Sequence, residues 1–274
     1  MSPFMFVTRA CWIVVFGLAA SPNLSAQDTV TRIDSVFASI GKDRGPGCSV
    51  GIDRNGAAPV TRSYGLASIE HNVPIAPTTR FDAASVAKQF TAASIALLAN
   101  QGKLSLSDNV RKYIPELPDY ASLITLQDLI DHTSGVRDQW DLLWLSGGRD
   151  DDATEDEDVL ALLAKQKALN FSPGSEFVYS NSGYTLLAMV VNRVSGLTLR
   201  QFAKKFIFEP RGMRDTEFLD DRFEILPNVA SGYRHARSSA WSPSPYLNDT
   251  YGPGGLFTTA LDMLTSPRLR HSAA

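Results

Sequence analysis

Several kinds of residue and segment are scarce in this sequence of 274 residues. Its two cysteines and four histidines are dispersed along the chain, so they do not form the ligand spacing of a metal site. The formal net charge is only -3, which gives no reason to expect nucleic acid as a partner. The apolar run near the N-terminus, residues 10–20, is shorter than the about 20 residues that a membrane-spanning helix needs. We therefore expect no metal, no cofactor, no nucleic-acid partner and no stable membrane span after processing.

The N-terminal segment has the pattern of a secretory signal peptide. Arg9 precedes the apolar run, and a short stretch ending in Ala26 follows it before Gln27. This order of a basic residue, an apolar run and a small residue predicts a signal peptide over residues 1–26. A retained N-terminal anchor is the alternative. The sequence thus predicts a secreted or periplasmic protein.

The rest of the chain, residues 27–274, is long enough to bury a sizeable core as one large domain or two small ones. Its only cysteine is Cys48, because Cys11 would leave with the signal peptide. An internal disulfide is then impossible, although an extracytoplasmic compartment would permit one. Cys48 lies in an apolar run, and we expect it to be a small buried residue.

A predicted buried helix near residue 85 organises the chain. Its apolar residues recur at helical spacing: Val86, Phe90, Ala93, Leu97 and Leu98. Gly102 supplies a C-terminal stop, so Ser85 and Lys88 lie in the opening turn and share one helix face. A serine hydroxyl beside an amine is the arrangement of an activated nucleophile. The alternative is a helix-initiating serine and a solvated lysine; the same spacing at Ser39 and Lys42 precedes residues that cannot open a helix.

Other elements follow from periodicity and turn signals. We expect helices over residues 30–40, 159–169, 185–194 and 197–208, and a glycine-rich turn leading into a helix over residues 252–263. Residues 47–53 and 59–64 read as two strands of a hairpin, joined through an Asn-Gly turn.

Two further segments suggest functional hypotheses, and each has a structural alternative. A helix beginning after Thr125 ends near His132, and a histidine there is more often a capping or packing residue than half of a Ser-His pair. The acidic run over residues 147–158 lacks the glycine and the ligand spacing of a calcium loop. We expect it to be a solvated surface loop.

A polar pair precedes the predicted helix over residues 185–194. Tyr179 and Asn181 are two positions apart, so in extended chain they face the same way. Polar atoms that point together just before a buried helix suggest a site. A tyrosine packed in the core and an asparagine that caps the helix are the alternative.

Together, these separated segments resemble one family. The segments are Ser85-Val86-Ala87-Lys88, Tyr179-Ser180-Asn181, His132-Thr133-Ser134-Gly135, Pro173-Gly174 and Gly254-Gly255-Leu256. In this order they resemble the serine β-lactamase and penicillin-binding-protein superfamily, specifically its class C β-lactamase and D-Ala-D-Ala carboxypeptidase branch. The resemblance implies an α+β fold in which an antiparallel sheet is flanked by helices, with an inserted, mostly helical region. It also implies that residues 27–274 form one serine hydrolase domain.

The resemblance assigns chemistry to four residues. It implies that Ser85 attacks a β-lactam, peptide or ester carbonyl and forms an acyl-enzyme, while Lys88 helps to remove its proton. Tyr179 would be a second base, and Asn181 would orient the substrate and the lysine. The backbone amide of Ser85 would be one oxyanion donor. The expected partner is a small-molecule or peptide substrate; the motifs leave β-lactamase, peptidase and esterase open.

The sequence departs from the family at its C-terminal end. The third motif of the superfamily, Lys/His-Thr/Ser-Gly on a strand, occurs nowhere in the 274 residues. In the family that part supplies sheet strands and a second oxyanion donor, so we expect a truncated chain with an incomplete sheet. A second interpretation therefore remains: the chain is a truncated, inactive homologue or a penicillin-binding module.

Overall fold

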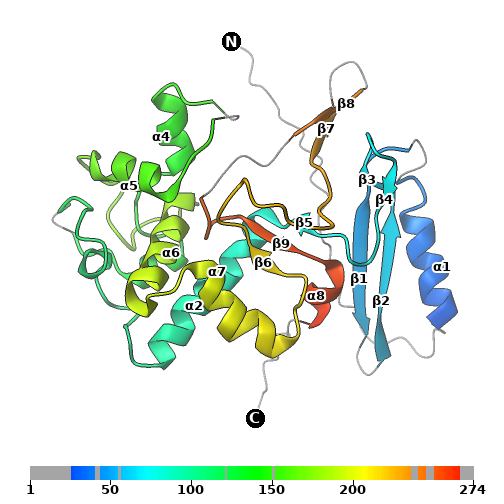
Figure 1. Cartoon of the computed structure of the whole chain (residues 1–274). Coiled ribbons are helices and arrows are strands. Elements are labelled where there is room, and N and C mark those ends of the chain that lie inside the picture. Colours follow the sequence, from blue (N-terminus) through cyan, green and yellow to red (C-terminus); the bar gives the residue numbers. More distant parts are fainter. Residues whose placement is uncertain are drawn as a thin grey trace.

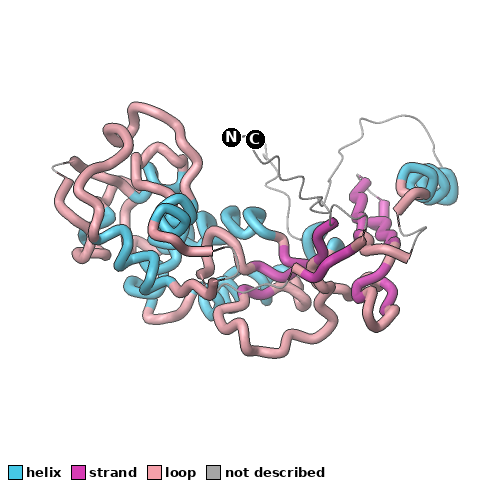
Figure 2. The backbone as a smooth tube through the Cα atoms, turned by 90° about the horizontal axis from the view of Figure 1, so that it is seen from above, coloured by secondary structure: helices cyan, strands magenta, loops and turns pink. Residues whose placement is uncertain are grey.

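The computed structural model describes residues 26–40, 44–54, 57–120, 122–149, 152–235, 240–244 and 250–265. Helices and small antiparallel sheets together form a mixed α+β architecture, which confirms the expected fold class. In Figure 1, a mostly helical region lies on the left, a short sheet crosses the middle, and a hairpin with one helix lies on the right. Figure 2 shows the same division from above. Residues 1–25 of the expected signal peptide lie outside the described residues.

The hairpin on the right of Figure 1 carries one helix on its face. Its elements are α1 (Ala26–Val36), β1 (Cys48–Arg54) and β2 (Ala57–Tyr64). The strands pair in antiparallel register, as the sequence predicted, while the expected turn residues 55–56 lie outside the described part of the chain. Ile33 of α1 packs against the buried Cys48 and Val50. The hairpin therefore has a small core of its own.

A three-stranded antiparallel sheet forms the middle of the molecule. Its order is β5 (Phe81–Asp82), β9 (Leu256–Thr258), β6 (Glu217–Phe218). The sequence interpretation missed β9, because it expected only a turn and a helix over residues 252–263; the helix is present as α8 (Ala260–Thr265). Just after β5, the backbone N–H of Ala83 donates to the carbonyl of Leu256 at 2.8 Å. The sheet thus holds the chain that follows Gly255 against the residues that precede Ser85.

Two helices pack against each other at the centre of the helical region. They are α2 (Lys88–Asn100) and α6 (Asn181–Ser195). Helix α6 ends at Ser195, and the following Gly196 caps it with a left-handed φ of 72°. It begins four residues earlier than expected, so Asn181 is its first residue and does not continue the extended segment of Tyr179. This corrects the expectation that both side chains project from one extended stretch.

The remaining elements surround these two helices and the sheets. The helices are α3 (Leu126–Ile130), α4 (Gln139–Leu145), α5 (Asp156–Ala164) and α7 (Leu199–Ala203), and the strands are β3 (Leu66–Ser68), β4 (Val73–Pro74), β7 (Tyr233–His235) and β8 (Trp241–Pro243). Helix α3 has the predicted start, because Thr125 and Asp128 form a capping box. No helix in the described part of the chain combines the length and apolar composition needed to cross a membrane.

The acidic run of residues 147–158 differs from its prediction as a solvated loop. Its last residues begin α5, where Glu155 and Asp158 form a capping box. Acidic side chains are favourable in a first helical turn because the unpaired backbone amides lie there. Asp156 is only 8% exposed, and burial raises the pKa of its carboxyl well above the usual range. The prediction was therefore wrong for Asp156.

Candidate active site

A strained turn presents Ser85 to solvent at the entrance to α2. Ala84 has a φ of 46°, a left-handed conformation that residues other than glycine rarely adopt and that often occurs at functional sites. The Asp82 carboxylate accepts the backbone N–H of Ala84 at 2.8 Å and supports this turn. A 3-10 turn, Ala84–Ala87, then leads into α2. As a result, the Ser85 side chain is exposed, and the residue lies in the opening turn, where the sequence predicted it.

Lys88 lies one turn further along and beneath Ser85. The residue is only 6% exposed. Its Nζ lies 3.2 Å from Ser85 Oγ, 2.9 Å from Asn181 Oδ1 and 2.8 Å from the carbonyl oxygen of Pro253. The loop before β9 and the first turn of α6 therefore both contribute to the surroundings of this amine.

The partners of Lys88 determine what its amine can do. Burial lowers its pKa to about 8, and the negative charge of Asp138 opposes this shift. About one tenth of the amine is then neutral at pH 7. Carbonyl oxygens only accept hydrogen bonds, so a neutral amine would donate its two N–H groups to Asn181 and Pro253. Its lone pair would then face the hydroxyl of Ser85.

Tyr179 approaches the same hydroxyl from another side. Its Oη donates to Ser85 Oγ at 2.7 Å, and its ring centroid lies 4.7 Å from Lys88 Nζ. The residue is 45% exposed, so one side of the ring faces solvent. The structure thus brings together all four residues that the sequence singled out: Ser85, Lys88, Tyr179 and Asn181.

His132 holds the segment that carries Tyr179. Its backbone carbonyl accepts the N–H of Val178 at 3.0 Å, and its Nδ1 accepts the N–H of Ser180 at 3.1 Å. Its ring lies 4.5 Å from the ring of Tyr179 and 5.2 Å from the ring of Tyr184. Burial, and then the positive charge of Lys88, lower the pKa of His132. His132 therefore has the packing role that the sequence favoured, because its ring packs against the rings of Tyr179 and Tyr184.

Comparison with known proteins places this arrangement in a family. Residues 33–266 match the family described as Beta-lactamase. The chain belongs to the β-lactamase family. A D-aminopeptidase of Cereibacter sphaeroides is 31% identical to it over 222 residues, which cover 81% of this chain and 42% of the relative. The β-lactamase-family chain therefore spans less than half the length of that relative.

Solved structures share the fold of this β-lactamase-family chain. An octameric penicillin-binding protein homologue from Pyrococcus abyssi is 28% identical and superposes with a TM-score of 0.76, covering 86% of this chain and 55% of the homologue. A class C β-lactamase superposes with a TM-score of 0.70 at 23% identity, covering 90% of this chain and 66% of that enzyme. The likeness to the class C β-lactamase, at this low identity, shows a shared fold alone.

The sequence interpretation missed Asp138. Its carboxylate accepts both the backbone N–H and the side-chain Nδ2 of Asn181, at 2.5 and 3.0 Å. No motif marks this residue, although an aspartate just before the apolar start of α4 is a helix-capping signal. Pro253 was missed as well, because it contributes only a backbone carbonyl.

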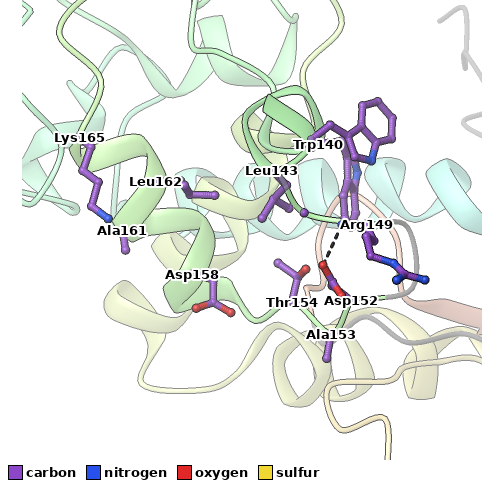
Figure 3. Close-up of a pocket in the computed structure, with 12 residues that line it drawn as sticks. Trp140, Leu143, Arg149, Asp152, Ala153, Thr154, Asp158, Ala161, Leu162 and Lys165 are labelled. Carbon is purple, nitrogen blue, oxygen red and sulfur yellow. Dashed lines mark hydrogen bonds between the residues drawn. The ribbon is translucent and has the colours of Figure 1, made fainter. Parts of the chain in front are cut away.

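A separate cavity of about 330 Å³ lies beside α4 and α5. Figure 3 shows it between α4, with Trp140 and Leu143, and α5, with Asp158 and Lys165. The residues that line it do not include the four of the candidate site.

In the described ranges, no group of three or more His, Cys, Asp or Glu side chains is arranged to hold a metal ion. The candidate active site therefore consists of the cluster around Ser85.

Proposed function

We propose that this chain is a serine hydrolase that forms an acyl-enzyme on Ser85 with a β-lactam, a D-Ala-D-Ala peptide or an ester. The observation that carries the proposal is the position of Ser85 Oγ, 3.2 Å from Lys88 Nζ and 2.7 Å from Tyr179 Oη. A serine hydroxyl is a weak nucleophile until an adjacent base takes its proton. The similarity to a D-aminopeptidase and to a penicillin-binding protein homologue supports the same class of chemistry.

The proposed acylation assigns one task to each side chain. Ser85 Oγ attacks the carbonyl carbon of the substrate while its proton passes to the neutral amine of Lys88. The carbonyl oxygen becomes an oxyanion, and the backbone N–H of Ser85 stabilises it. When the intermediate collapses, the bond to the leaving group breaks and Tyr179 delivers a proton to that group. Water then attacks the ester on Ser85 and gives a proton to the deprotonated Tyr179, while the proton on Lys88 returns to Ser85 Oγ as the acid is released.

A panel of reporter substrates tests this function. The purified chain is mixed with a chromogenic cephalosporin, a D-Ala-D-Ala peptide whose released D-alanine is measured, and a p-nitrophenyl ester, which represent the three candidate activities. We expect a burst of product equal to the enzyme concentration, or continued turnover, with at least one of them. Absence of both with all three reporters would contradict the proposed function. The reporter with the highest kcat/KM identifies the preferred substrate class.

Tyr179→Phe tests the proposed proton delivery. The variant removes the hydroxyl 2.7 Å from Ser85 Oγ but keeps the ring against His132. We expect the acylation rate to fall by about 10²- to 10³-fold, the size of a lost general acid or base. Tyr184→Phe is the matched control, because that hydroxyl donates to the carbonyl of Ile130 and not to Ser85. Equal rates in the two variants would remove Tyr179 from the mechanism.

Substitution of His132 tests whether the segment of Tyr179 must be held in place. Asparagine and glycine both tolerate the left-handed φ of 58° at this position, but only asparagine can accept the N–H of Ser180. We expect His132→Gly to lower the acylation rate by about 10- to 100-fold, since small misplacements of a catalytic group are costly. His132→Asn is expected to recover most of that loss. Stopped-flow acylation of both variants, with thermal unfolding as a check on folding, measures the difference.

We also propose that the protein acts outside the cytoplasm. The support is the order of Arg9, the apolar run of residues 10–20 and the small residues up to Ala26. This agrees with a substrate such as a β-lactam or a cell-wall peptide.

A further inference from the structure

The carboxylate of Asp138 joins two helix starts beside the candidate site. One oxygen, Oδ1, accepts the backbone N–H of Trp140 at 2.9 Å and caps α4. The other, Oδ2, accepts the backbone N–H of Asn181 at 2.5 Å and its side-chain Nδ2 at 3.0 Å. Three N–H groups therefore converge on one carboxylate, and two of them belong to Asn181.

This convergence decides which way the side-chain amide of Asn181 faces. The two ends of an amide are nearly isosteric, so its orientation depends on its hydrogen-bonding partners. A carboxylate can only accept, so the NH₂ group turns toward Asp138 and Oδ1 turns toward Lys88 Nζ, 2.9 Å away. In the flipped orientation, the amide oxygen would face a carboxylate and the NH₂ group would face the amine of Lys88. The first contact would be repulsive, and the second would be repulsive whenever Lys88 is protonated, because an ammonium group only donates hydrogen bonds.

We infer that Asp138 is a positioning residue of the acylation site, which orients the amide of Asn181 and through it the amine of Lys88. The inference rests on the proposed function, since it concerns the amine that would accept the proton of Ser85. With Asn181 Oδ1 fixed, one N–H of Lys88 is committed to that oxygen and another to the carbonyl of Pro253. The lone pair of the neutral amine then has one direction left, toward Ser85.

Asp138 also acts on Lys88 through its charge. Burial lowers the pKa of Lys88, and the negative charge of Asp138 counteracts part of that effect. The other titratable groups around the amine are His132, Tyr179 and Tyr184. Burial lowers the pKa of His132 and raises the pKa of Tyr184, so both groups are uncharged at neutral pH. Among the residues that the structure describes, Asp138 is the anion whose charge acts on the pKa of Lys88.

Two substitutions of Asp138 separate orientation from charge. Asp138→Asn removes the charge and leaves one oxygen, which can accept from Asn181 or cap α4 but not both, because the two roles fall on different oxygens of the carboxylate. Asp138→Ser keeps a helix cap, because serine is a good N-cap residue, but its shorter side chain does not reach Asn181. Thermal unfolding of both variants measures whether a weakened cap of α4 contributes to a difference between them.

The first readout is the rate of acylation by a fluorescent penicillin between pH 5 and pH 10. For Asp138→Asn, we expect the midpoint of the acid limb to move roughly 0.5–1 pH unit downward, because removal of a nearby negative charge favours the neutral amine. For Asp138→Ser, we expect the plateau rate to fall by about tenfold or more, because the amide of Asn181 is then free to flip. Wild-type midpoints and plateau rates in both variants would overturn the inference.

The second readout does not depend on activity. In protein labelled with ¹³Cε-lysine, the signal of Lys88 is assigned by its absence from the Lys88→Met spectrum and is then titrated. We expect Asp138→Asn to lower the pKa of Lys88 relative to wild type, in the direction of the acid-limb shift. If wild type forms no acyl-enzyme while this titration shifts, the proposed function fails and the electrostatic action of Asp138 on Lys88 stands. An unshifted titration overturns the electrostatic part of the inference directly.

Discussion

Replacing Ser85 by alanine is expected to abolish covalent labelling by a fluorescent penicillin and turnover of every reporter substrate. The reason is that no other oxygen occupies the position between Lys88 Nζ and Tyr179 Oη that Ser85 Oγ holds. Loss of the serine nucleophile costs roughly 10⁶ in kcat in a hydrolase whose nucleophile and base act as one unit. Gel fluorescence and steady-state kinetics of the purified variant measure both losses.

The sequence offers a matched control for this substitution. Ser39 begins the other Ser-x-x-Lys pair, but it lies in an exposed turn after α1. Ser39→Ala is therefore expected to label and turn over like wild type. If Ser85→Ala kept wild-type labelling, or if Ser39→Ala lost it, Ser85 would not be the nucleophile.

Replacing Lys88 by methionine is expected to lower the acylation rate by about 10²- to 10⁴-fold, the usual contribution of a general base. Methionine is unbranched and apolar, so it fills the buried site of a residue that is only 6% exposed while removing the amine. The serine would then remain in place without a neighbouring group to take its proton. Stopped-flow acylation of the variant measures the loss.

The pH dependence of the wild-type acylation rate also tests the role of Lys88 as the base. Lys88 acts as a base only when neutral, and its pKa is lowered to about 8. The acylation rate should therefore rise about tenfold per pH unit below pH 8 and level off above it. In Lys88→Met this rise of the rate below pH 8 should be absent. In Lys103→Met, which changes an exposed lysine, it should remain. If the rate still rose with pH in Lys88→Met, the proton transfer would belong to another group.

Local patterns predicted the parts of the fold and the site that depend on neighbouring residues. The contact of Ser85 with Lys88 follows from their spacing of three, because residues three apart share a helix face. The helix start after Thr125, where a capping box forms, follows in the same way from local chemistry. Each of these features depends only on residues that lie within one helical turn of each other.

Features that depend on tertiary contacts were less predictable. Strand β9 is three residues long and buried at every position, so it has no alternation that periodicity could detect. Asp138 reads as an ordinary helix cap, and its contact with Asn181 spans 43 positions of sequence. The proximity of Tyr179 to Ser85 was predicted only through the family resemblance, because no local pattern relates residues 94 positions apart.

The most direct test of the account is to locate the acyl group by mass spectrometry. Wild-type protein is incubated with a β-lactam, quenched in acid and digested with trypsin, which releases residues 81–88 as one peptide containing Ser85. The account predicts that this peptide gains the mass of the intact β-lactam and that fragmentation places the addition on Ser85. An acyl group on any other residue, or an intact protein that gains no mass with any β-lactam, D-amino acid derivative or ester, would contradict it.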